Sequence, residues 1–176
     1  MSLGFKRLSK IIEPEIRTYQ RGFRPNILTI DNTFIVRQIY EKCNEYNIDL
    51  RNIFIDFSQT FDTISRDVIY NSLTKYNVPD KLIKRIKFTI HRTKMKVKVS
   101  NSCSERFETK RGVRQGDPLS ALLFSVVSDS VITNLEMRGN VTTRLKKICA
   151  YADDIVITGR TKQILIDTFC KLKHEA

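Results

Sequence analysis

The stretch Tyr151-Ala152-Asp153-Asp154 decides how the whole chain is interpreted. It separates two short apolar runs, Lys147-Ile148-Cys149-Ala150 and Ile155-Val156-Ile157-Thr158. Two such runs with a short polar link predict a β-hairpin that carries the acidic pair at its turn. Carboxylates at a turn stay solvated and are free to bind a ligand. Because Asp is also common in ordinary turns, for its local hydrogen bonds, this pair alone favours a structural interpretation.

A second acidic position favours a ligand-binding role for the acidic pair over a structural one. The run Asn52-Ile53-Phe54-Ile55-Asp56-Phe57 is typical of a buried strand that carries a carboxylate near its end. A carboxylate in an apolar strand is costly unless it is paired, and a divalent metal is the simplest partner for several converging acids. If this strand lies beside the hairpin, Asp56, Asp153 and Asp154 form one cluster. Such a cluster can hold two Mg²⁺ ions about 4 Å apart, which is the arrangement of nucleotidyl-transfer enzymes.

Four blocks in a fixed order carry a resemblance to a known family. Two of them are the acidic blocks, from Phe54 to Asp62 and from Tyr151 to Asp154. The other two are Gln20-Arg21-Gly22-Phe23-Arg24-Pro25, followed by Thr29 and Asp31, and Arg111-Gly112-Val113-Arg114-Gln115-Gly116-Asp117-Pro118-Leu119-Ser120. Together they resemble the reverse transcriptases of non-LTR (LINE-type) retrotransposons. The chain departs from the family pattern in three places: Thr60 replaces alanine, Ala121 replaces proline, and Asn26-Ile27-Leu28-Thr29 replaces Gly-Arg-Ser-Thr.

The resemblance implies an RNA-directed DNA polymerase that uses two Mg²⁺ ions, with Mn²⁺ as an alternative. Its metal ligands would be Asp56, Asp153 and Asp154. The first two should matter most, because neighbouring residues on a hairpin point apart. Its partners would be an RNA template, a DNA primer, deoxynucleoside triphosphates and other parts of a longer polyprotein. The expected substrate-binding residues are Phe61, which would exclude a ribose 2′-hydroxyl, with Arg114, Gln115, Gly116 and Tyr151.

The expected fold is α+β. Residues 51–176 would form a reverse-transcriptase palm, an antiparallel sheet with helices packed on one face, and residues 1–50 a partial fingers segment. The thumb would be absent, so that the chain is a single domain truncated at both ends. Periodicity and capping residues predict the helices, with Asp117 as the N-cap of the fifth and Gly139-Asn140 at its end. Their expected ranges are 1–12, 31–47, 65–77, 79–90, 119–137 and 161–173.

The run Thr93-Lys94-Met95-Lys96-Val97-Lys98-Val99 alternates strictly between apolar and basic residues. This pattern predicts a strand with one buried face and one lysine-covered face, turned back by Asn101-Ser102. Its three lysines would lie ~6.6 Å apart, close to the phosphate spacing of a nucleic-acid backbone. With Arg111, they are the expected nucleic-acid-binding residues. Lysines on a strand equally guard against edge-to-edge aggregation, so both interpretations stay open.

Composition limits the classes of partner. The chain has 31 Lys and Arg against 19 Asp and Glu, a formal charge of +12, which favours a polyanion. The four cysteines are widely spaced and lack a C-x-x-C pair, which indicates reduced thiols rather than a zinc site. No stretch approaches the ~20 apolar residues that span a membrane, and no signal peptide is recognisable. We therefore expect no membrane partner and an intracellular location, in the nucleus or the cytoplasm.

Two alternatives remain at this stage. One is a catalytically inactive, truncated element remnant that acts at most as a basic nucleic-acid-binding module. The other is an RNA-dependent RNA polymerase or a maturase-like relative. Phe61 argues against a ribonucleotide polymerase, which needs a smaller or polar residue there. It does not exclude the maturase-like protein, because the palm motifs are shared.

Overall fold

The structure is a computed structural model of residues 1–176 and describes all of them except 1–2, 25–26, 58, 92, 138–146 and 176. The expected helices are confirmed, each within a few residues, whereas the short α3 was not expected. Gly139 and Asn140, the expected end of α6, lie outside the described residues. The helices are α1 (Leu3–Ile12), α2 (Thr29–Glu45), α3 (Thr60–Thr63), α4 (Arg66–Lys75), α5 (Asp80–Ile90), α6 (Pro118–Met137) and α7 (Lys162–Glu175). The strands are β1 (Arg51–Asp56), β2 (Thr93–Met95), β3 (Lys98–Val99), β4 (Ser102–Cys103), β5 (Phe107–Thr109), β6 (Lys147–Tyr151) and β7 (Asp154–Gly159).

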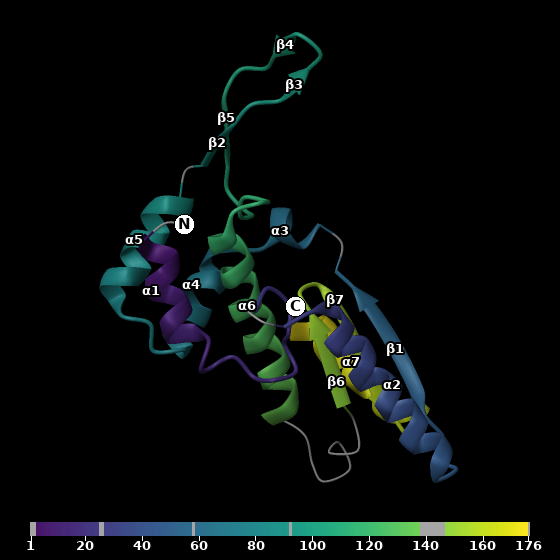
Figure 1. The fold of residues 1–176 in the computed structure, drawn as a ribbon. Coiled ribbons are helices and arrows are strands. Elements are labelled where there is room, and N and C mark those ends of the chain that lie inside the picture. The colour runs from purple at the N-terminus through teal and green to yellow at the C-terminus, as the bar shows by residue number, and fades with distance from the viewer. Residues whose placement is uncertain (1–2, 25–26, 58, 92, 138–146, 176) are drawn as a thin grey trace.

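An antiparallel sheet in the order β1-β7-β6 forms the centre of one half of the molecule (Figure 1). Its register pairs Ile53 with Ile157 and Ile55 with Ile155, so these side chains share one face. Helix α7 packs against this face, and α6 adds Ile132 to it. The expected α+β fold with an antiparallel sheet is therefore confirmed. The buried residues of this core are Ile132, Ile148, Ala150, Ile155, Ile157 and Leu165.

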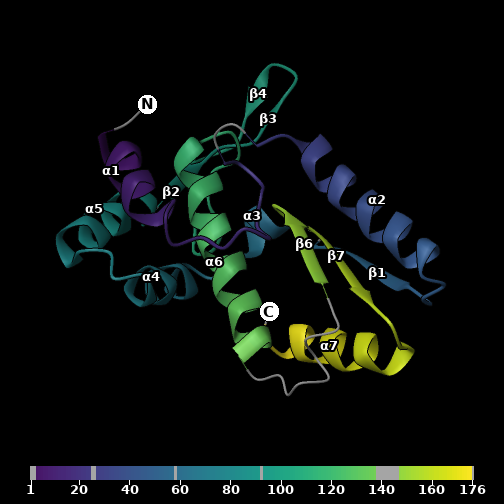
Figure 2. The same ribbon diagram turned by 60° about the horizontal axis from the view of Figure 1, so that its bottom comes forward.

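Helix α2 lies on the other side of the sheet from α7 (Figure 2). It reaches both edge strands: the Asn52 side chain of β1 donates to the Tyr40 hydroxyl, and Asn32 donates to the Ala150 carbonyl of β6 at 3.2 Å. None of its described side chains is buried. The face of the sheet opposite Ile55 and Ile155 is therefore only partly covered, and Phe54 on it is 72% exposed.

A second core fills the other half of the molecule. Helices α1, α4 and α5 surround the N-terminal part of α6, which is the longest helix in the described chain. Leu8 and Ile12 of α1 are fully buried there, beside Leu73 of α4 and Leu123 of α6. Helix α1, from the expected fingers segment, thus shares a core with residues of the expected palm. The boundary at residue 50 remains a prediction.

The hairpin from Thr93 to Thr109 projects away from both cores (Figure 1). β2 pairs with β5 and β3 with β4, so the chain turns back on itself as expected. The turn lies at Ser100-Asn101 rather than at Asn101-Ser102, because Ser102 already pairs with Val99. The expected buried face is wrong, because Met95, Val97 and Val99 are 41%, 51% and 67% exposed. The strand leaves the body of the molecule after Thr93, and no described element covers its apolar side. It is also interrupted between β2 and β3, so the lysines do not lie on one regular strand.

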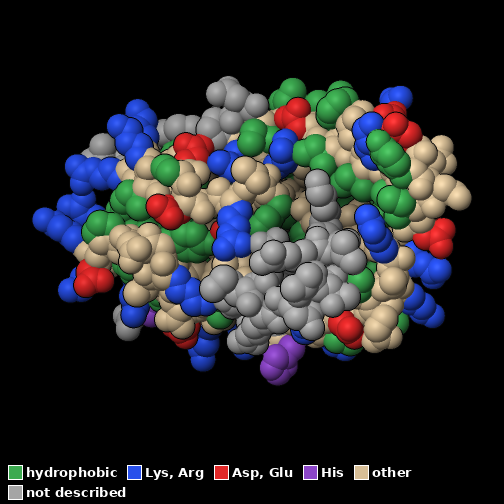
Figure 3. All heavy atoms as spheres, turned by 90° about the horizontal axis from the view of Figure 1, so that it is seen from below, with side chains coloured by type: hydrophobic (Ala, Val, Ile, Leu, Met, Phe, Trp, Pro, Cys, Tyr) green, Lys and Arg blue, Asp and Glu red, His purple; other side chains and the backbone are tan. Residues whose placement is uncertain are grey.

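The surface agrees with the basic composition. On the face seen in Figure 3, Lys and Arg side chains are spread over much of the visible surface, with acidic side chains between them. Within the described residues, no helix is both long and apolar enough to cross a membrane. All four cysteines lie among the described residues, and no disulfide joins them.

Candidate active site

Two of the expected catalytic acids lie opposite each other in the sheet. The register pairs Asp56, the last residue of β1, with Asp154, the first residue of β7. Alternation places both on the face opposite Ile55 and Ile155. Both residues are exposed. The pairing of β1 with β7 thus brings the two acids to one end of the sheet, which is the condition that the predicted acidic cluster required.

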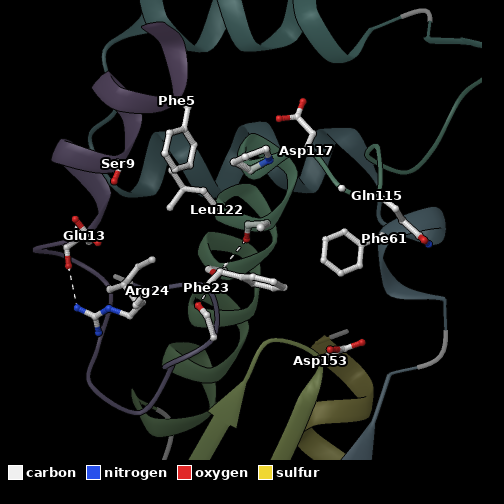
Figure 4. A pocket seen from close by; sticks show the side chains of 16 residues that line it. Phe5, Ser9, Glu13, Phe23, Arg24, Phe61, Gln115, Asp117, Leu122 and Asp153 are labelled. Atoms are coloured by element: carbon white, nitrogen blue, oxygen red, sulfur yellow. Dashed lines mark hydrogen bonds between the residues drawn. The ribbon is translucent and has the colours of Figure 1, made fainter. Parts of the chain in front are cut away.

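The third acid lies in the turn between β6 and β7. Tyr151 pairs with Asp154, so Ala152 and Asp153 form a two-residue link. Ala152 is buried and has a φ of +57°, which is uncommon for a residue with a side chain. Asp153 is half-buried and points toward the cavity drawn in Figure 4. The expected hairpin is confirmed, with the acidic pair divided between the turn and the start of β7.

A cavity of about 940 Å³ opens beside this turn (Figure 4). It brings together four of the expected site residues: Asp153, Phe61, Gln115 and Gly116. Five other lining residues belong to the motif blocks of the sequence but had no predicted role in the site: Gly22, Phe23, Arg24, Asp117 and Pro118. No local pattern marks the remaining ones as a cavity wall, and they are Phe5, Ser9, Glu13, Ile16, Ala121, Leu122 and Ser125.

Phe61 lines the cavity and also packs against two other aromatic rings. Its ring centroid is 5.3 Å from that of Phe124 and 6.3 Å from that of Phe23, which meets it edge-on. Phe23 is 53% exposed and has a φ of +59°. Phe61 therefore has the role of a packed core aromatic on one side and faces the cavity on the other.

Arg66 holds the chain that leads into the Arg111–Ser120 block. Its guanidinium is buried and donates to the carbonyl oxygens of Thr109 at 2.8 Å, Gly112 at 3.1 Å and Arg111 at 3.2 Å. Such a fork of donors fits several carbonyls at once. The hairpin that carries the lysines is thus anchored at its base.

Gly112 lets this block approach α3. Its φ is +81°, and a Cβ at this position would lie 2.6 Å from the Asp62 carbonyl oxygen. The next amide, of Val113, donates to the Phe61 carbonyl at 2.7 Å. This contact fixes the distance between the Arg111–Ser120 block and the Phe61 backbone.

The end of the block turns into α6. The Asp117 side chain accepts a hydrogen bond from the Leu119 amide at 3.0 Å, so the expected N-cap is confirmed. Gln115 is exposed, and its side chain donates to the Asp62 carboxylate at 3.2 Å. Gly116 has a φ of +84°, and no atom of the described chain lies within 4 Å of the place that a Cβ would take there. Open space next to Gly116 and Gln115 leaves room for a ligand.

The structure does not bring the other expected residues to this cavity. Arg111 and Arg114 line a separate pocket of about 210 Å³. Asp56, Asp154 and Tyr151 are not in the cavity wall, and Lys94, Lys96 and Lys98 lie on the projecting hairpin. Among the described residues, no group of three or more His, Cys, Asp or Glu side chains is close enough to hold a metal ion.

Comparison with known proteins identifies relatives over most of the chain. A family model described as reverse transcriptase (RNA-dependent DNA polymerase) matches residues 1–176. The chain is 31% identical over 153 residues to a retrovirus-related Pol polyprotein from the type-2 retrotransposable element R2DM of Drosophila melanogaster. It is 29% identical over 140 residues to a Pol polyprotein from the type-1 retrotransposable element R2 of Popillia japonica. The expected resemblance to non-LTR retrotransposon enzymes is confirmed.

These relatives are much longer proteins. The two alignments cover 84% and 77% of this chain, but only 14% and 22% of the relatives. The chain therefore spans less than a quarter of their length.

Solved structures of telomerase share the fold. Telomerase from Candida albicans, in complex with a TWJ fragment of telomeric RNA, gives a TM-score of 0.71 at 12% identity and covers 96% of this chain and 31% of its own. The corresponding Candida tropicalis complex gives 0.75 at 13% identity, over 98% and 31%. At such identity the likeness shows the fold alone, and it agrees with the expected palm. Together with the family match along its whole length, this fold means that the chain belongs to the reverse transcriptase (RNA-dependent DNA polymerase) family.

Proposed function

We propose that this chain is the palm of an RNA-directed DNA polymerase of a non-LTR retrotransposon, preceded by part of the fingers. The observation that carries the proposal is the register that sets Asp56 opposite Asp154, with Asp153 in the adjoining turn. Asp153 faces a cavity that also contains Phe61 and Gln115. One acidic end of a sheet thus lies next to a cavity large enough for a nucleotide.

The three carboxylates would hold two Mg²⁺ ions, or Mn²⁺ in their place. Within the described part of the chain, the carboxylates of Asp56, Asp153 and Asp154 make no hydrogen bond or ion pair, so their oxygens are available. Oxygen donors of this kind suit hard divalent cations. Their side chains would have to turn toward one another, which their solvated positions permit. When bound, such ions supply positive charge where an attacking hydroxyl and a leaving phosphate oxygen develop negative charge.

The cavity residues would position the substrates. In the proposed reaction the primer 3′-oxygen forms a bond with the α-phosphorus of a deoxynucleoside triphosphate, and the bond to the β-phosphate oxygen breaks to release pyrophosphate. Phe61 would lie against the sugar and exclude a 2′-hydroxyl, while Gln115 and Gly116 would contact the nucleotide and its template partner. Positioning and charge stabilisation carry such catalysis.

Arg111 and the hairpin lysines Lys94, Lys96 and Lys98 would bind the nucleic acid. Arg114 and Tyr151 would contact the substrate, although neither lines the cavity that contains Asp153. A net charge of +12 supports binding of an RNA template and a DNA primer. Other parts of a longer polyprotein would add to this surface.

Extension of a primed RNA template by the purified chain, with Mg²⁺ and deoxynucleotides, tests the proposal. Substituting Asp153→Asn or Asp56→Asn removes a proposed ligand charge and should lower synthesis at least ~100-fold, because charge stabilisation is the main catalytic term. Asp49→Asn is the matched control, since Asp49 is exposed and lies in the segment just before β1. It should leave synthesis unchanged.

Two outcomes would contradict the proposal. Synthesis that persists in both ligand variants would exclude these carboxylates from catalysis. A native chain that binds RNA but extends no primer would favour the inactive nucleic-acid-binding module instead.

A further inference from the structure

Gln20 is fully buried, and both the oxygen and the nitrogen of its side-chain amide form hydrogen bonds. Its oxygen accepts hydrogen bonds from the Ala152 amide at 3.1 Å and from the Gly22 amide at 3.0 Å. Its nitrogen donates to the Ser128 hydroxyl at 3.0 Å and to the Ala152 carbonyl at 3.4 Å. One side chain therefore contacts both backbone polar groups of Ala152, the residue immediately before Asp153.

These hydrogen bonds pair backbone groups of the turn that the sheet leaves without partners. The ladder between β6 and β7 ends at the pair of Tyr151 and Asp154, so the polar groups of Ala152 lie outside it. Ala152 is only 3% exposed, and buried peptide groups that lack partners are costly. Its positive φ is a conformation that alanine rarely adopts. The Gln20 amide supplies the hydrogen bonds that hold this conformation.

The backbone on either side of Gln20 is fixed against the same hairpin. The Ala150 amide donates to the Tyr19 carbonyl and the Arg21 amide donates to the Ala150 carbonyl, both at 2.9 Å. Gly22 completes the contact, because a Cβ there would lie 2.2 Å from the Ala152 nitrogen. The segment from Tyr19 to Gly22 thus runs along β6 and closes on the turn.

We infer that Gln20 is a positioning residue for catalysis: it sets the backbone of Ala152 and thereby the direction in which Asp153 projects into the cavity. The inference rests on the proposed polymerase function and extends it to a residue that touches neither metal nor substrate. A side chain of similar size without polar atoms would fill the same space. It would leave both groups of Ala152 unpaired, and the turn could relax to another conformation.

The variant Gln20→Met keeps the approximate volume and removes all four hydrogen bonds. Ser128→Ala removes one partner of the amide and leaves its contacts with Ala152. Leu73→Ala creates a cavity in the other core. It is the control for a variant that loses stability and nothing else. Each purified variant is compared by thermal unfolding, by Mn²⁺ binding measured with electron paramagnetic resonance, and by kcat and KM for a deoxynucleotide.

We expect Gln20→Met to lower kcat about 10- to 100-fold, as a displaced catalytic group does, with little change in KM. It should also weaken Mn²⁺ binding, which a purely structural residue would not do once the folded fraction is taken into account. Ser128→Ala should show a small effect in the same direction. Leu73→Ala should lower the unfolding temperature while the folded fraction keeps its kcat and Mn²⁺ affinity.

Unchanged kcat and Mn²⁺ affinity in a folded Gln20→Met variant would overturn the inference. If that variant does not fold, Gly22→Ala gives a second test, because its Cβ displaces the segment while the Gln20 amide stays intact. It should weaken Mn²⁺ binding as well, and normal binding in Gly22→Ala would then overturn the inference. Failure of the proposed function is distinguishable, since a native chain that makes no DNA would still show Mn²⁺ binding that depends on Gln20.

Discussion

Contacts of the Phe61 backbone with Gly112 and Val113, together with the packing of its ring, fix the position of Phe61. Its carbonyl accepts the Val113 amide at 2.7 Å and lies 2.9 Å from where a Cβ of Gly112 would be. Its ring packs between Phe124 and Phe23. A ring held in this way cannot move aside for a larger sugar. At the residue scale, the geometry therefore supports a fixed steric boundary in the cavity.

Replacing the Phe61 ring with a smaller side chain should allow the cavity to accept ribonucleotides. We expect Phe61→Val to raise the relative use of ribonucleoside triphosphates ~10-fold or more, because a few buried carbon atoms of a pocket wall are worth about that discrimination. The measurement is the ratio of kcat/KM for a matched deoxynucleotide and ribonucleotide. Phe88→Val is the control, since Phe88 is 87% exposed on α5. An unchanged ratio in Phe61→Val would remove Phe61 from the nucleotide pocket.

At the scale of elements, the contact between α4 and α6 includes a buried acid. Asp129 is 1% exposed, and its carboxylate accepts hydrogen bonds from the Tyr76 hydroxyl and from the Arg17 amide, the latter at 3.3 Å. Burial raises the pKa of Tyr76 above its ordinary value, and the hydrogen bond to Asp129 raises it further. The protonated hydroxyl is thus part of the folded state.

Tyr76→Phe should therefore destabilise the fold by about 1–3 kcal/mol at pH 8, because a buried acceptor loses a donor. The raised pKa means that the contribution is complete below pH ~10 and is lost as the pH rises past the ordinary value. The native chain should lose stability as the pH rises above about 10, and the variant should lose less. Urea unfolding at several pH values measures this, with Tyr46→Phe, at an exposed tyrosine, as the control. Equal pH dependence in Tyr76→Phe and the native chain would contradict the assignment.

The projecting hairpin is the element most suited to a nucleic-acid backbone. Its basic residues exceed its acidic ones, Glu105 and Glu108. No described residue forms an ion pair with them, and Arg66 anchors the base of the hairpin. The basic residues of the hairpin are Lys94, Lys96, Lys98 and Arg106, and Lys110 and Arg111 follow it directly.

Replacing Lys94, Lys96 and Lys98 together with alanine should flatten the dependence of log affinity for RNA on log salt. Three lost phosphate contacts correspond to a change in slope of about 2 to 3. Fluorescence anisotropy over a salt series measures the slope. The same substitution of Lys162, Lys171 and Lys173 on α7 is the control and should have a smaller effect. Equal slopes in the two triple variants would leave the hairpin with no particular role in binding.

The sequence predicted the positions of helices and strands better than the contacts between them. Period and capping residues located α6 and its N-cap Asp117, because these are local effects. The alternation from Thr93 to Val99 showed which side chains share a face, but not that nothing in the described chain would cover it. The contact between Gln20 and Ala152, in the turn between β6 and β7, joins residues 132 positions apart, and no local pattern marks it.

At the scale of the whole molecule, α6 connects the two cores. Its N-terminal part packs with α1, α4 and α5, and Ile132 near its other end packs against the sheet. The cavity takes residues from α1, α3, α6 and the hairpin turn, so both cores shape it. The positions of Phe61 and Asp153 relative to each other therefore depend on the packing of α6.

The central claim is that acids from two separate strands bind the same metal ions, and metal-directed cleavage tests it most directly. Fe²⁺ replaces Mg²⁺, and ascorbate with peroxide then produces hydroxyl radicals that cut the chain next to the bound ion. We predict cuts near Asp56 and near Asp153, both suppressed by excess Mg²⁺ and both lost in Asp153→Asn. Cuts at only one of these positions, or cuts that persist in Asp153→Asn, would contradict a shared metal site.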